Sequence, residues 1–246
     1  MTSRKTTART AGWIYLGVAV TGGFSMLYVP SLIVAGDAAA TLRNIAASEG
    51  LYRLGLVSGL ACQALFVFLG LALYRLLAEV DRARARLMVG LVVTGAAVAF
   101  LNMLNQVPAL VVVSGAPYLD AFEPAQRQAL AMFFLDLQAQ GIVLAKVFFG
   151  LWLIPLGLLI VRSGFLPKAL GVLLVVGGVG YVVDVLVHFL APSVAPTVAP
   201  IATAPSGIAE VGLILWLLIK GAKEEPENTK GTEGSASRAL GTSALG

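Results

Sequence analysis

Six long apolar runs, separated by short polar segments, dominate the pattern of hydrophobic and polar positions along the chain. A helix needs about 20 apolar residues to cross the hydrocarbon core of a bilayer, and most of these runs reach that length. The pattern therefore predicts an all-α, polytopic membrane helix bundle with about six transmembrane helices, which forms one domain over residues 1–222. The expected spans are Gly12–Val34, Leu51–Leu77, Leu87–Val113, a helix within Glu123–Arg162, Leu166–Leu190 and Ser206–Ile219.

Three connecting segments need their own interpretation. Asp37 precedes three alanines, a pattern typical of an N-cap, and we expect a short extracytoplasmic helix near residues 37–49. The stretch Glu123–Arg162 is longer than a bilayer is thick at about 1.5 Å per residue. Either Ala125–Gln140 projects from the membrane, or the helix bends near Gly141. The Pro-, Ala-, Val- and Thr-rich segment Ala191–Pro205 is predicted to be a loop.

The basic residues predict the orientation of the bundle. With the N-terminus inside, the outer connections carry only Arg43, Arg53 and Arg127. The inner segments carry Arg4, Lys5, Arg9, Arg75, Arg82, Arg84, Arg86, Arg162, Lys168, Lys220 and Lys223. Loops rich in Lys and Arg face the cytoplasm, so both termini are expected there. The chain is accordingly expected to be a multi-pass protein of the plasma membrane. Residues 223–246, rich in Gly, Ser and Thr, are predicted to form a disordered cytoplasmic tail.

Composition narrows the function classes. Hydrophobic residues make up 58% of the chain and charged residues 12%, a balance that one soluble core cannot accommodate. The net charge of +4 does not indicate nucleic acid as a partner, because the basic residues lie between apolar runs rather than in a patch with aromatics. A single cysteine and a single histidine leave no basis for a disulfide scaffold or a metal site, and no cofactor is predicted.

Polar side chains inside the apolar runs are the candidates for function, because such groups are costly in the hydrocarbon core. Counted from the basic ends, most of them lie in the outer half of the membrane, with Glu210 nearer the middle. We therefore predict a polar pocket in the outer half of the bundle, closed on the inner side by apolar packing. Gln63 is expected to join it. The candidate ligand-binding residues are Asn102, Asn105, Gln106, Asp136, Gln140, Lys146, Tyr181, Asp184, His188 and Glu210.

The same residues allow catalytic and structural interpretations. Asp184 and His188 are spaced like a carboxylate that orients an imidazole for general-base work. The candidates for catalysis are Asp184, His188, Glu210 and Asp136. Lys146 is expected to pair with Asp184 or with Glu210, whereas the amides could simply hydrogen-bond neighbouring helices. The glycines of Gly177–Gly180 indicate close helix packing rather than a phosphate-binding loop.

Several short stretches resemble one family. In chain order they are Ala11–Leu16, Gly36–Thr41, Ala47–Gly55, Ala72–Leu77, Leu101–Asn105, Phe134–Leu137 and Arg162–Pro167. The chain resembles the bacterial membrane proteins grouped as domain of unknown function 4386, over roughly residues 8 to 222. The resemblance implies a membrane helix bundle and carries no established activity. Gln138 stands where the family commonly has a histidine.

Three functions stay open from the sequence. The first is a protein that binds or transports a small amphipathic or lipid-like molecule in the outer pocket. The second is an intramembrane enzyme that uses buried carboxylates as general acid or base on an isoprenoid or fatty substrate. The third is a structural or accessory membrane protein. Membrane lipids are expected partners in each, and self-association into a homo-oligomer is a further option.

Overall fold

The computed structural model describes residues 3–223, and all regular secondary structure within them is helical. Six helical segments are long and apolar enough to cross a membrane, which confirms the predicted fold class. The 3₁₀ turns η1 (Leu104–Gln106) and η2 (Pro117–Ala121) accompany the α-helices. The α-helices are α1 (Arg4–Ser31), α2 (Ala38–Ala47), α3 (Glu49–Leu77), α4 (Arg82–Met103), α5 (Val107–Val113), α6 (Pro124–Leu151), α7 (Leu153–Ser163), α8 (Lys168–Leu190) and α9 (Ala195–Ile219).

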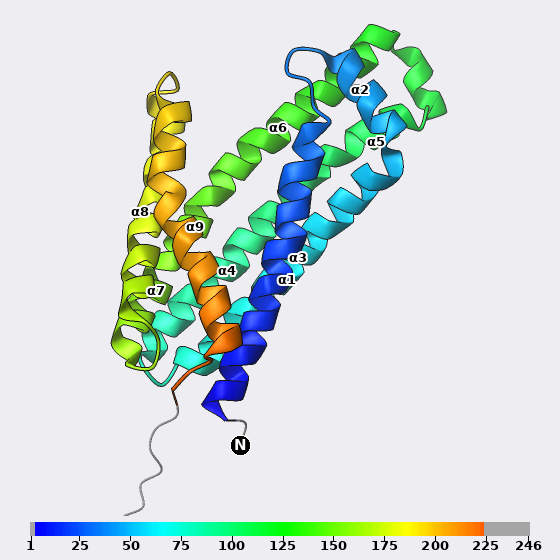
Figure 1. Ribbon diagram of the computed structural model, residues 1–246. Coiled ribbons are helices and arrows are strands. Elements are labelled where there is room, and N and C mark those ends of the chain that lie inside the picture. Colours follow the sequence, from blue (N-terminus) through cyan, green and yellow to red (C-terminus); the bar gives the residue numbers. More distant parts are fainter. Residues whose placement is uncertain (1–2, 224–246) are drawn as a thin grey trace, which may run out of the picture.

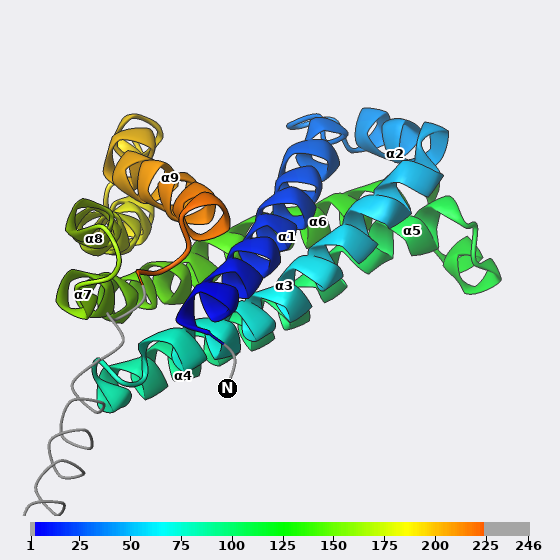
Figure 2. The ribbon, with the colours of Figure 1, turned by 60° about the horizontal axis from the view of Figure 1, so that its bottom comes forward.

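The helices form two groups that meet at one end and diverge toward the other (Figure 1). One group contains α1, α3, α4 and α6, and the other contains α7, α8 and α9; Figure 2 shows the same division from another side. The end where the groups meet holds the beginning of α1, the α3–α4 and α7–α8 connections and the end of α9, and we call it the basic end. The opposite end, beside α2, is called the α2 end. The predicted tail after residue 223 lies outside the described residues.

Helix α2 lies where the sequence predicts a short helix. Asp37 is its N-cap, and the side-chain Oδ1 accepts a hydrogen bond of 2.8 Å from the backbone N–H of Ala40. Thr41 and Ile45 are buried against the rest of the α2 end. One face of this short helix is therefore packed onto the bundle.

The predicted loop over Ala191–Pro205 is wrong, because α9 begins at Ala195 and already includes most of that segment. The prolines there suggested a helix breaker, but membrane helices tolerate proline, and one in the first turn suits helix geometry. Close packing on α8 holds the segment in helical form. A Cβ placed on Gly180 would collide with the backbone of Ala202, and one on Gly177 would collide with Ser206, so α8 and α9 touch along their backbones.

The long fourth run does break, but at Trp152 rather than near Gly141. Pro155 explains the position, because its nitrogen cannot donate to the carbonyl of residue 151 and its ring crowds that carbonyl. Gly141 has a different role. A Cβ there would collide with the side chain of Asn102, so the glycine allows α4 to approach α6 closely.

Glycines also bring α8 against α6 and α7. Gly171 lies against the backbone of Gly157, and Gly178 lies against that of Gly150. This confirms that the glycines around Gly178 serve close helix packing, as the sequence indicates.

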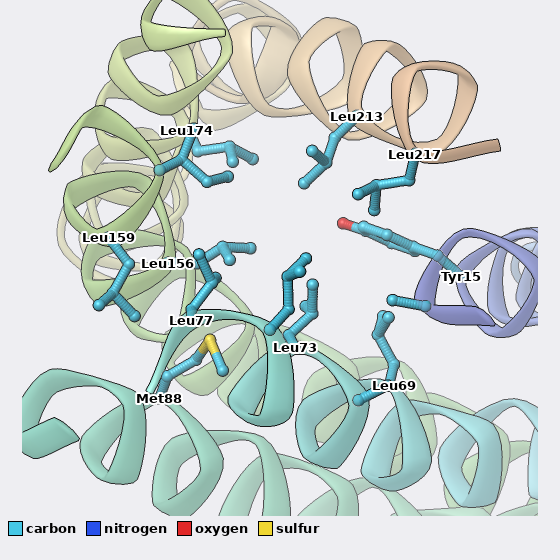
Figure 3. Packing of buried hydrophobic residues seen from close by; sticks show 14 of the residues in the cluster. Tyr15, Leu69, Leu73, Leu77, Met88, Leu156, Leu159, Leu174, Leu213 and Leu217 are labelled. Carbon is cyan, nitrogen blue, oxygen red and sulfur yellow. The ribbon is translucent and has the colours of Figure 1, made fainter. Parts of the chain in front are cut away.

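Two clusters of buried apolar side chains lie at different levels of the bundle. The larger cluster fills the basic end and includes leucines of α3, α7, α8 and α9. Figure 3 shows Tyr15 reaching from α1 into the space between α9, with Leu213 and Leu217, and α3, with Leu69 and Leu73. The smaller cluster lies at the α2 end around Tyr52, whose hydroxyl donates to the backbone carbonyl of Gln106 at 2.9 Å.

Candidate functional site

A crevice lies between the two apolar clusters, at the junction of the two helix groups. It consists of a cavity of about 260 Å³ and a smaller one of about 70 Å³. Both cavities are lined by Gly22, Met26, Cys62, Gln63, Ile142 and Phe149, so they form one continuous crevice along α1, α3 and α6. Residues of α8 and α9 complete the larger cavity. Met26 is 59% exposed, which indicates that the crevice reaches the surface beside α1.

Glu210 and Tyr15 form the polar centre of the larger cavity. The Tyr15 hydroxyl donates to Oε2 of Glu210 at 2.7 Å, and both side chains line the cavity. The tyrosine is only 3% exposed. Glu210, which stands alone among the polar residues of its own run, thus has a partner on the first helix. Sequence reasoning missed Tyr15, because only the packing of α1 against α9 brings the two residues together.

Lys146 lies in the wall of the same cavity and is bound to Asp184. The ammonium donates to Oδ2 of Asp184 at 2.8 Å, and the carboxylate side chain is only 5% exposed. Of the two partners that the sequence leaves open for Lys146, the structure therefore selects Asp184. The ion pair joins α6 to α8 and leaves no net charge at this point of the wall.

His188 does not pair with Asp184, contrary to the general-base interpretation. Its Nε2 lies 3.0 Å from Oε1 of Gln140 on α6, while the carboxylate of Asp184 is engaged by Lys146. Within residues 3–223, no hydrogen bond joins Asp184 to His188. The spacing in the sequence put both residues near one face of α8, but each turns to a different residue of α6. The arrangement required of a base therefore does not form.

Amide side chains line the smaller cavity. Asn102 donates to the backbone carbonyl of Gln138 at 2.8 Å and accepts from Asn105 at 3.1 Å. Gln106 and Gln63 each have a buried side-chain oxygen without a hydrogen-bond partner in the described part of the chain. Asn102 thus joins α4 to α6 and Asn105 supports it from η1, whereas the two glutamines hold spare acceptors beside the crevice.

Five of the ten predicted ligand-binding residues line the crevice, and they divide between its two cavities. Lys146, Tyr181 and Glu210 line the larger cavity, and Asn102 and Gln106 line the smaller one. Asp136 is exposed on α6 and lines neither cavity. Residues 3–223 contain no group of three or more His, Cys, Asp or Glu side chains that could hold a metal ion.

Comparison with known proteins identifies relatives without naming an activity. A family model described as a domain of unknown function, DUF4386, matches residues 10–221. An uncharacterized protein from Archaeoglobus fulgidus is 36% identical over 80 residues, which cover 32% of this chain and 46% of that protein. No solved structure matches.

Proposed function

The chain belongs to the membrane protein family described as domain of unknown function DUF4386, and we propose that it binds a small amphipathic or lipid-like molecule in the crevice. The observation that carries the proposal is the larger cavity itself. Sites for small molecules are concave and mostly apolar, with a few polar groups that fix the orientation of the ligand. Here the polar groups are Glu210, Lys146 and Gln63, and the rest of the wall is largely apolar.

The position of the crevice favours an amphipathic ligand. Its polar groups lie inside the bundle, whereas its rim includes the exposed Met26 on a helix that crosses the membrane. A molecule with a polar head and an apolar tail could place the head at Glu210 and leave the tail toward the lipid. The apolar cluster at the basic end closes the crevice on that side, so the geometry supports binding more directly than passage through the bundle.

The enzyme alternative receives less support. Asp184 is held by Lys146, His188 contacts Gln140, and Asp136 is exposed and lines neither cavity. Glu210 is the remaining carboxylate that lines the crevice. Its hydrogen-bond partner is the phenol of Tyr15, and a single acid without a second carboxylate or an imidazole beside it is a weak basis for general acid–base chemistry.

The distribution of Lys and Arg supports a cytoplasmic position for the basic end, and we propose the plasma membrane as the location. In this orientation the crevice lies on the outer side of the larger apolar cluster. A reporter enzyme that is active only in the cytoplasm, fused after residue 223, should then be active in intact cells. An inactive fusion in a protein that is inserted normally would contradict this orientation.

Native mass spectrometry of the protein, extracted gently from its membrane, tests the binding proposal. Gly23 lines the cavity, and a Cβ added there meets no atom within 4 Å, so Gly23→Leu should fill the cavity without a clash. Gly207 is exposed and has the same open surroundings, but it does not line the cavity, so Gly207→Leu is the matched control.

We expect a co-purifying small molecule on the native protein and on Gly207→Leu, and its loss from Gly23→Leu. Equal retention in both variants would place the molecule elsewhere on the protein and contradict the proposal. A cavity that is empty in every sample, including protein prepared with added host lipid extract, would favour a structural role for the bundle.

A further inference from the structure

We propose that the ligand is an organic cation with a single positive charge and a compact apolar body, an inference that rests on the proposed function of the crevice. The charges of the wall give the first reason. Among the described residues that line the larger cavity, Lys146 and Glu210 are the charged ones. Lys146 is neutralised by Asp184 at 2.8 Å, so an ionised Glu210 gives the site one negative charge.

The hydrogen bonds of Glu210 leave room for a ligand. Its Oε2 accepts from Tyr15, a neutral donor that does not cancel the charge. Its Oε1 has no hydrogen-bond partner within residues 3–223 and is not fully buried. A carboxylate in a low-dielectric wall strongly favours a cation as its partner. The free oxygen of Glu210 therefore offers a place for a positive charge.

Aromatic rings line the cavity that holds this carboxylate. The larger cavity is lined by Tyr15, Phe66, Phe149, Trp152 and Tyr181. The ring of Trp152 lies 6.3 Å from that of Tyr15 and 5.0 Å from that of Phe66, both edge-on, so the rings form one continuous wall. Aromatic rings attract cations through their quadrupoles, most strongly where water is excluded. Walls of this kind favour an alkylated ammonium over a small hydrated ion.

Size limits the ligand further. The cavity of about 260 Å³ lies slightly below the range of about 300–1,000 Å³ typical of drug-sized ligands. A quaternary ammonium with one aromatic or short alkyl arm fits such a space, and a longer tail could extend past Met26 into the lipid. An anion would meet Glu210 at close range, and a neutral molecule would leave the carboxylate without a countercharge.

Three probes of nearly the same shape and different charge test the inference. They are benzyltrimethylammonium, its uncharged carbon isostere neopentylbenzene, and phenylmethanesulfonate. Each is tritiated, and binding to protein in nanodiscs is measured by equilibrium dialysis after subtraction of binding to protein-free nanodiscs. The proteins are the native chain, Glu210→Gln, Asp136→Asn and the pair Gly23→Leu and Gly207→Leu. Asp136→Asn removes an acid of the same membrane bundle outside the cavity, and Glu210→Gln keeps an oxygen for Tyr15.

We expect the cation to bind at least about tenfold more tightly than the neutral isostere, and the anion not to bind. Glu210→Gln should remove that tenfold preference, Asp136→Asn should keep it, and Gly23→Leu should abolish saturable binding of all probes. Equal or tighter binding of the neutral or anionic probe would overturn the cation inference and leave the binding function standing. Absence of saturable binding for all three probes would overturn the cation inference, and the native mass spectrometry then decides the proposed function separately.

Discussion

The ion pair between Lys146 and Asp184 should be the strongest single electrostatic link between α6 and α8. At 2.8 Å, two unit charges attract by about 6 kcal/mol at an effective dielectric constant of about 20. Desolvation of the carboxylate, which is only 5% exposed, offsets most of this attraction. Loss of one partner leaves the other charge buried, at a cost of about 3–5 kcal/mol. Because the Lys146 side chain is 29% exposed, we expect the lower end of that range, about 3 kcal/mol.

A double-mutant cycle measures this coupling. Lys146→Met, Asp184→Asn and the double variant are unfolded with SDS in mixed micelles, and the free energy of unfolding is compared with that of the native chain. Each single variant should lose about 3 kcal/mol, and the double variant should recover at least half of the summed loss, because it leaves no unpaired charge. Asp136→Asn serves as the control and should change stability by less than about 0.5 kcal/mol, because Asp136 is exposed. A double variant that loses the full sum of the two single effects would refute the coupling.

Three further predictions concern other parts of the structure. Gly157→Ala should cost about 1–3 kcal/mol in the same unfolding assay, because the new Cβ meets the backbone of α8, whereas Gly90→Ala, which meets no atom, should not destabilise the protein. The backbone N–H of Arg84 and the guanidinium groups of Arg84 and Arg162 hold the pKa of Asp81 below its ordinary value. The contribution of Asp81 to stability is therefore complete above about pH 4 and is lost as the pH falls through the lowered pKa. Asp81→Asn should therefore show a smaller fall in the unfolding midpoint between pH 5 and pH 3 than the native chain, and an equal fall would contradict this assignment. Tyr15→Phe should cost about 1.5–3 kcal/mol but keep the preference for the cationic probe, because the charge of Glu210 remains; loss of that preference in a folded variant would show that the hydroxyl itself contacts the ligand.

The helical spans could be predicted because hydropathy and the placement of Lys and Arg act locally along the chain. The rules that failed were rules for soluble proteins. In a soluble protein, prolines such as those of Ala195–Pro205 favour a loop, because the backbone groups freed from the helix can bond to water. A helix inside a bilayer keeps its backbone hydrogen bonds and tolerates the residue. Likewise Gly141 suggested a hinge, whereas Pro155 sets the break and the glycine makes room for Asn102.

The site was only partly predictable. The position of a residue along its helix follows from the sequence, but the side chain that it contacts on another helix does not. Counting residues from the basic ends placed Lys146 and Asp184 at a common level, and the structure joins them. The same count could not tell that His188 turns to Gln140, since the tilt and rotation of α6 against α8 decide that contact. Tyr15 gave no signal at all, because a tyrosine in an apolar run is an ordinary packing residue until its neighbour is known.

The divergence of the two helix groups explains why polar residues line the crevice. Where the groups are in contact, at the basic end, apolar side chains can fill the space between them and a charge would stay unsolvated. Farther from the basic end the groups separate, and apolar packing no longer fills the space between them. The inner faces of α1, α6 and α9 there line the open crevice. Lys146 and Asp184 can lie beside the open crevice because they neutralise one another, and such a pair requires no ligand. Glu210 has no such neutralising partner, because Tyr15 supplies a hydrogen bond without a charge. A purely structural bundle would be served equally well by a glutamine at this position. An acid without a countercharge in an aromatic wall is therefore the feature that a structural role leaves unexplained and a cationic ligand accounts for.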